Sequence, residues 1–67
     1  MILNKVHLGD TFELINLVPD NSVDFIIGYC ECVTPFEYKV VSSEEINSSG
    51  RFYPKGTSFY PKELKII

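Results

Sequence analysis

Helix-favouring residues and long apolar runs are both scarce in this sequence. Alanine and glutamine are absent, and the apolar runs reach only three residues, as in Phe25-Ile26-Ile27. A transmembrane helix needs about 20 apolar residues, and a secretory signal peptide needs an apolar stretch near the N-terminus. The sequence has neither, so we expect a cytoplasmic protein built mainly from strands.

The chain is also short, at 67 residues, which leaves room for one small domain over residues 1–67. Hydrophobic residues make up 45% of it and charged residues 22%, a composition typical of globular proteins. A domain of this size buries only roughly 60% of the surface of its unfolded chain and is marginally stable. Because association adds stability, this size also favours an oligomer.

Cysteine and histidine, the usual ligands of structural zinc, are nearly missing. The chain has two cysteines, Cys30 and Cys32, and one histidine, His7. Residues i and i+2 of a strand lie about 6.5–7 Å apart, which suits a disulfide poorly, and structural zinc needs four ligands. We predict reduced, partly buried thiols, no metal site and no cofactor.

Residue patterns typical of catalysis are lacking as well. No carboxylate pair is set apart by an apolar pocket, no Cys-His or Ser-His pairing is indicated, and no glycine-rich phosphate loop is present. We predict that the protein is not an enzyme and has no catalytic residue.

Positive charge is scarce in residues 1–50, where two lysines face eight carboxylates for a net charge of −6. Residues 51–67 reverse this, with four cations against one glutamate. The total of −3 argues against non-specific binding to duplex nucleic acid. The carboxylates form either a solvated surface or an acidic face that meets a basic partner; they are Asp10, Glu13, Asp20, Asp24, Glu31, Glu37, Glu44 and Glu45.

Alternating apolar residues and turn clusters predict short strands. Thr11–Val18 fits a strand with Phe12 and Leu14 on one face, or else a helix that Asp10 and Glu13 cap, and we favour the strand. The other expected segments are an N-terminal strand around Val6, a turn at Pro19–Ser22, a strand at Val23–Val33 with a bulge or sharp bend at Gly28, a strand at Glu37–Val41, a loop or hairpin tip at Ser42–Gly50, and a short strand at Lys65–Ile67.

Five or six short strands in so short a chain predict an all-β fold, and closure into a small barrel is the economical arrangement because it removes sheet edges. Four segments resemble SH3-like barrels. They are Lys5–Phe12, Ile27–Val33, Phe36–Val41 as the third strand, and Phe59–Ile67, the last with a single helical turn before its final strand. The polar insert Ser42–Gly50 departs from that family. The aromatic motif with which SH3 domains bind peptides is not recognisable in this sequence. The resemblance therefore implies the fold and not the binding of proline-rich peptides.

A second resemblance covers Gly9–Ile27, which is similar to the N-terminal stretch of amino-methyltransferases that modify DNA adenine or cytosine. In that family the strand ends in Asp-Pro-Pro-Tyr, which holds the target base. Here Ile27 is followed by Gly28-Tyr29-Cys30-Glu31, and the glycine-rich loop for the methyl donor is absent. We therefore predict no methyltransferase activity.

The sequence Phe-Tyr-Pro-Lys occurs twice, at Phe52–Lys55 and at Phe59–Lys62. Three interpretations of this repeat are open. Its aromatic residues belong to the core and its prolines end strands, or the aromatic residues contact another protein, or they stack on the bases of single-stranded nucleic acid. We expect Phe52 and Phe59 to face inward and the tyrosines to be exposed. The partner-binding residues that we predict are Arg51, Tyr53, Lys55, Tyr60 and Lys62.

Together these features predict a small binding module that docks on another protein. A compact chain rich in Tyr, Phe, Asn and Lys is typical of phage or mobile-element accessory proteins, which favours a regulator or inhibitor of a host enzyme. The alternative is a small barrel that binds single-stranded nucleic acid through residues 51–65.

Overall fold

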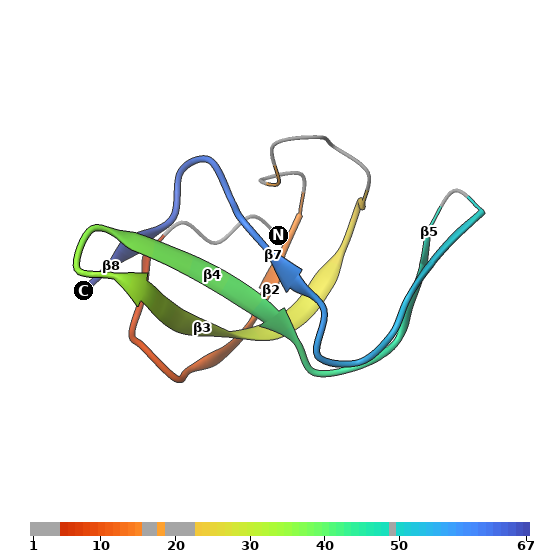
Figure 1. Ribbon diagram of the computed structural model, residues 1–67, viewed down its shortest axis with the longest axis horizontal. Helices are drawn as coiled ribbons and strands as arrows, with labels where there is room; N and C mark the ends of the chain where they lie inside the picture. The colour runs from red at the N-terminus through yellow and green to blue at the C-terminus, as the bar shows by residue number, and fades with distance from the viewer. Residues whose placement is uncertain (1–4, 16–17, 19–22, 49) are drawn as a thin grey trace.

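Four antiparallel strands form the main sheet of the protein, in the order β2–β3–β4–β7 (Figure 1). The computed structural model describes residues 5–15, 18, 23–48 and 50–67. The four strands are β2 (Thr11–Leu14), β3 (Ile26–Thr34), β4 (Glu37–Ser42) and β7 (Ser58–Phe59). The 9 residues of β3 make it the longest described strand, and it pairs with β2 on one side and β4 on the other.

Two smaller sheets complete the described fold. β1 (Lys5–Val6) pairs in parallel with β8 (Lys65–Ile66), so segments from the beginning and the end of the chain lie side by side. β5 (Ile46–Ser48) and β6 (Arg51–Tyr53) form an antiparallel hairpin that extends away from the main sheet at one end of the molecule (Figure 1).

The all-β prediction is confirmed, because the described residues form strands and turns and contain no helix. They form eight short strands rather than five or six, and β5 is one reason, since it occupies the segment expected to be a loop or hairpin tip. The described strands pair as three separate sheets, so a closed barrel is not detected among them. The described part also contains no helix with the length and hydropathy needed to cross a bilayer.

Individual strand predictions hold to different degrees. The strand interpretation of Thr11–Val18 is confirmed for β2, and the short closing strand is confirmed as β8. The strand expected from Val23 begins only at Ile26, while β4 matches its predicted range to within one residue. The turn at Pro19–Ser22 lies outside the described residues.

The hydrophobic core lies against one face of the main sheet. Alternation along β2 buries Phe12 and Leu14 and exposes Glu13 between them, as expected for a strand with one face packed and one solvated. The register places Cys30 beside Val40, and Val40 beside Phe59, so three strands contribute neighbouring side chains. The other buried members of this core are Val6, Val18, Val23 and Ile26.

Gly28 is buried, and the bulge that was one of its two predicted roles is not found at this position. The irregularity of register in β3 falls between Cys32 and Thr34, whereas Gly28 pairs regularly with Phe12 and Ser42. A Cβ atom at Gly28 would collide with the carbonyl oxygen of Val41 and lie 2.9 Å from Cγ1 of Val40. Glycine is required here because β4 approaches too closely for a side chain.

Candidate protein-docking site

Phe36 is held away from the core by the tight connection between β3 and β4. Thr34 pairs with Glu37, so Pro35 and Phe36 alone form the tip of this hairpin. The backbone N–H of Phe36 donates to Oγ1 of Thr34 at 3.2 Å, which fixes the turn. At this tip Phe36 is 92% exposed, an unusual position for a large apolar side chain.

The chain segment after β7 passes beside this tip. Phe59 pairs with Val40 on β4, and β7 runs antiparallel to β4, so Tyr60 continues along β4 toward its beginning. Pro61 lacks a backbone N–H and cannot extend the pairing. Tyr60 is 52% exposed, which leaves its ring available at the surface.

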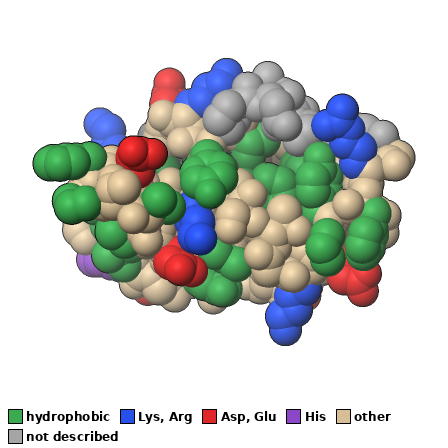
Figure 2. Space-filling model, in the orientation of Figure 1, with side chains coloured by type: hydrophobic (Ala, Val, Ile, Leu, Met, Phe, Trp, Pro, Cys, Tyr) green, Lys and Arg blue, Asp and Glu red, His purple; other side chains and the backbone are tan. Residues whose placement is uncertain are grey.

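Together the two segments form an open pocket of about 220 Å³, which we call the tip pocket. It is lined by Phe36, Glu37, Tyr38, Tyr60, Pro61, Lys62 and Leu64. The lining residues therefore combine aromatic and apolar side chains with one carboxylate and one amine. Figure 2 shows hydrophobic side chains exposed together with acidic and basic ones at the end of the molecule that carries the β3–β4 turn.

The structure divides the predicted partner-binding residues into two groups. Tyr60 and Lys62 meet in the tip pocket. Arg51 and Tyr53 belong to β6, and Lys55 lies in the turn after it, so these three come from the hairpin side of the molecule (Figure 1).

Tyr53 and Phe52 have the reverse of their predicted orientations. Phe52 is 57% exposed, whereas Tyr53 is half-buried and packs edge-on against the Phe59 ring, with centroids 5.3 Å apart at 62°. The prediction that Phe52 faces inward is wrong, and that for Phe59, which is 7% exposed, is confirmed. The register explains the reversal: β6 pairs with β5 and places Tyr53 beside the partly buried Ile46, both packed against the core.

Sequence reasoning missed the contribution of the β3–β4 hairpin to this site. The resemblance to SH3-like barrels implies that Phe36 begins the third strand, where alternation would give it a partner. The signal that indicates otherwise is Thr34-Pro35-Phe36, a hydroxyl residue and a proline that favour a turn just before an aromatic residue.

The two thiols lie on the same strand but in different surroundings. Both are free, with Cys30 almost fully buried and Cys32 exposed near the end of β3, so neither thiol is partly buried as predicted. The Cys32 thiol donates to the carbonyl oxygen of Thr34 at 3.0 Å. Burial, and secondarily the charge of Cys32, raise the pKa of the Cys30 thiol from its ordinary value of 9.0, which favours the neutral, unreactive form.

The predicted acidic residues are all on the surface where they are described. Asp10, Glu13, Asp24, Glu31, Glu37, Glu44 and Glu45 are exposed, and Asp20 lies outside the described residues. Within the described part, no group of three or more His, Cys, Asp or Glu side chains is arranged to hold a metal ion.

Comparison with protein-family models, with curated proteins and with solved structures finds no match for this chain.

Proposed function

We propose that this protein is a small, non-enzymatic module that docks on another protein through the tip pocket. The observation that carries the proposal is the exposure of Phe36 beside Tyr60 around a shallow pocket. Exposing a large aromatic side chain to water is unfavourable. Aromatic side chains are also the residues most enriched among energetic hot spots of protein interfaces.

The pocket also carries the polar groups that give an interface its specificity. Glu37 and Lys62 lie among the aromatic residues that line it. Aromatic residues accompanied by polar and charged groups at the rim are the usual anatomy of a protein interface. Regulation or inhibition of a host enzyme by occupying its surface is the activity that we propose for such a module.

The alternative, binding of single-stranded nucleic acid, has less support. Arg51 and Lys55 lie on and after the hairpin, whereas Lys62 lies at the tip pocket beside Glu37. A single-strand site needs a positive groove that follows the phosphate backbone. The separation of these cations argues against such a groove.

An SH3-like arrangement of the fold belongs to the same proposal. It is supported by the pairing of β1 with β8, which joins the early and late parts of the chain across the core, and by the succession of short strands. Closure of the barrel would require backbone hydrogen bonds between the edge strand β2 and the β1–β8 pair.

The test is affinity capture from host lysate, followed by binding measurements on the captured partner with matched phenylalanine variants. We expect Phe36→Ala and Tyr60→Ala each to weaken binding by more than ~1 kcal/mol, the usual hot-spot threshold. Phe52→Ala is the control, because Phe52 is an exposed aromatic outside the tip pocket.

Two outcomes contradict the proposal. If Phe52→Ala weakens binding and Phe36→Ala does not, the docking surface lies on the hairpin. If the captured ligand is nucleic acid and its binding falls steeply between low and moderate salt, the nucleic-acid alternative is correct.

A further inference from the structure

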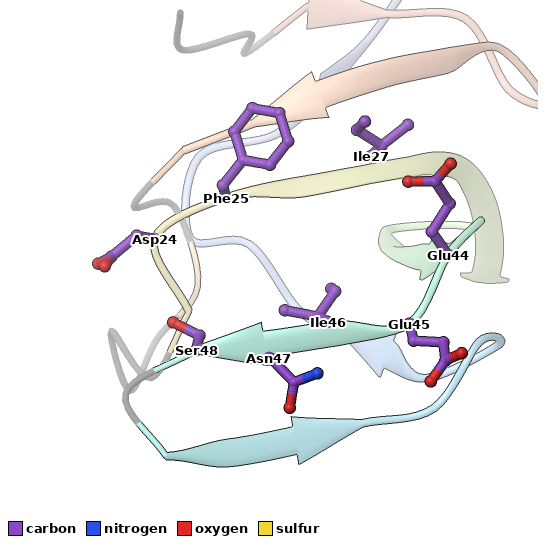
Figure 3. Close-up of a pocket in the computed structure, with 8 residues that line it drawn as sticks. All are labelled: Asp24, Phe25, Ile27, Glu44, Glu45, Ile46, Asn47 and Ser48. Carbon is purple, nitrogen blue, oxygen red and sulfur yellow. The ribbon is translucent and has the colours of Figure 1, made fainter.

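A second surface, distinct from the tip pocket, lies between the beginning of β3 and the hairpin. It is an open groove of about 330 Å³, which we call the β5 groove (Figure 3). Phe25 and Ile27 line it from the β3 side, and Ile46 lines it from β5. Phe25 is 44% exposed, so the groove presents apolar surface that no described residue covers.

One edge of β5 is available for pairing. Among the described residues β5 pairs only with β6, so its other edge carries backbone N–H and C=O groups outside any described sheet. An unpaired edge is a template for an additional strand, and extended peptides use such edges in many complexes.

Ser42 fixes the position of this edge relative to the main sheet. Its side chain is almost fully buried. The Ser42 hydroxyl donates to the carbonyl oxygen of Glu44 and accepts from the Glu44 N–H at 3.3 Å. The N–H of Ser43 donates to the carbonyl oxygen of Ile27 at 2.9 Å. The chain therefore leaves β4 for β5 through a hydrogen-bonded corner, which holds the groove in shape.

Charge identifies the chemistry of the occupant. Asp24 lies at one end of the groove and Glu44 and Glu45 lie at the other (Figure 3). No lysine or arginine of the described residues lines the groove, so its charge is negative throughout. Complementarity calls for an extended segment that carries cations at its ends and an apolar side chain between them.

We propose that the β5 groove binds a cationic, apolar-centred peptide segment of a partner protein as an added strand along β5. In an extended segment alternate side chains point the same way, so one apolar side chain faces Phe25 and Ile46 while lysines or arginines two positions before and after it reach the carboxylates. This site is independent of the tip pocket, and either surface functions without the other.

The probe is a synthetic peptide of sequence Lys-Thr-Ile-Thr-Lys, which places both lysines on the same face as the isoleucine. It is titrated into the intact protein with the backbone amides observed by NMR. We expect saturable shifts at Asp24–Ile27 and at Glu44–Ser48, with no shift at Phe36 or Tyr60. The same peptide with proline in place of both threonines should not bind, because proline cannot donate to a strand edge.

Matched charge variants separate the groove from general acidity. We expect Asp24→Asn combined with Glu45→Gln to weaken peptide binding about tenfold. Glu13→Gln should leave it unchanged, since Glu13 is an exposed carboxylate on β2 that does not line the groove.

Three results overturn the proposal: no saturable shift at the groove, equal binding of the proline peptide, or equal loss of affinity in the Glu13→Gln control. A fourth is a concentration-dependent shift at the same amides without peptide, which would identify a second copy of this chain as the occupant. None of these results bears on the tip pocket, whose test uses different variants.

Discussion

Phe52 and Phe59 begin the two copies of the Phe-Tyr-Pro-Lys repeat but lie in opposite environments. Phe59 pairs with Val40 in the main sheet and is buried, whereas Phe52 pairs with Asn47 on the hairpin and is exposed. The tyrosines are reversed accordingly, with Tyr53 packed on Phe59 and Tyr60 at the surface. A side chain's environment therefore follows from which strand it pairs with and not from the local sequence.

The two phenylalanines provide a matched test of this assignment. Phe59→Ala should cost about 3–5 kcal/mol of unfolding free energy, the usual loss for a core phenylalanine, which is a large share of a small domain's stability. Phe52→Ala should change it by less than ~0.5 kcal/mol. Urea unfolding followed by circular dichroism measures both, and equal losses would show that Phe52 is also buried.

At the scale of the element, the contact between β3 and β4 depends on Gly28. The two strands share the most extensive register among the described strands, and Gly28 lies at the point where a side chain would meet the backbone of Val41. The collision is with backbone, so it cannot be relieved by rotating a flexible side chain. Any residue other than glycine must separate the strands locally.

Gly28→Ala should therefore destabilise the protein by about 1–3 kcal/mol, and Gly28→Asn by more, because asparagine is larger. Gly50 is the control. Its φ of 77° at the hairpin tip favours glycine for conformational reasons, and a Cβ there meets no atom within 4 Å.

Because asparagine tolerates this left-handed conformation, Gly50→Asn should cost less than Gly50→Ala. Denaturant unfolding of all four variants gives the comparison. The same order at both positions would contradict the steric explanation for Gly28.

At the scale of the whole molecule, stability is distributed unevenly. β3 pairs with strands on both sides and contributes Ile26 and Cys30 to the core. The β5–β6 hairpin is a separate two-stranded sheet, joined to the core mainly through the partly buried Ile46 and Tyr53. A two-stranded hairpin by itself is only marginally stable in water.

Hydrogen exchange should therefore resolve two levels of protection. We expect the amides that join β3 to β4 to exchange at least about tenfold more slowly than those that join β5 to β6, since local opening of the hairpin breaks few buried contacts. NMR-detected exchange at neutral pH measures both sets. Uniform protection would mean that the hairpin opens only when the whole domain unfolds.

The sequence by itself determined the fold class and the position of several strands. Strict alternation in Thr11–Leu14 and the β-branched, aromatic run that includes β3 are local patterns, and each favours extended backbone. The local sequence also predicted two residues of the tip pocket, Tyr60 and Lys62. They are an aromatic residue and a cation on either side of a proline that ends a strand.

Only the tertiary structure decided which residues gather into sites. Phe36 meets Tyr60, which is 24 positions later in the sequence, because β4 and β7 pair in one register. The β5 groove likewise joins Asp24–Ile27 to Glu44–Ser48 through the corner at Ser42. Register and strand order are set by long-range packing of side chains, and no local spacing in the sequence encodes which distant segments become neighbours.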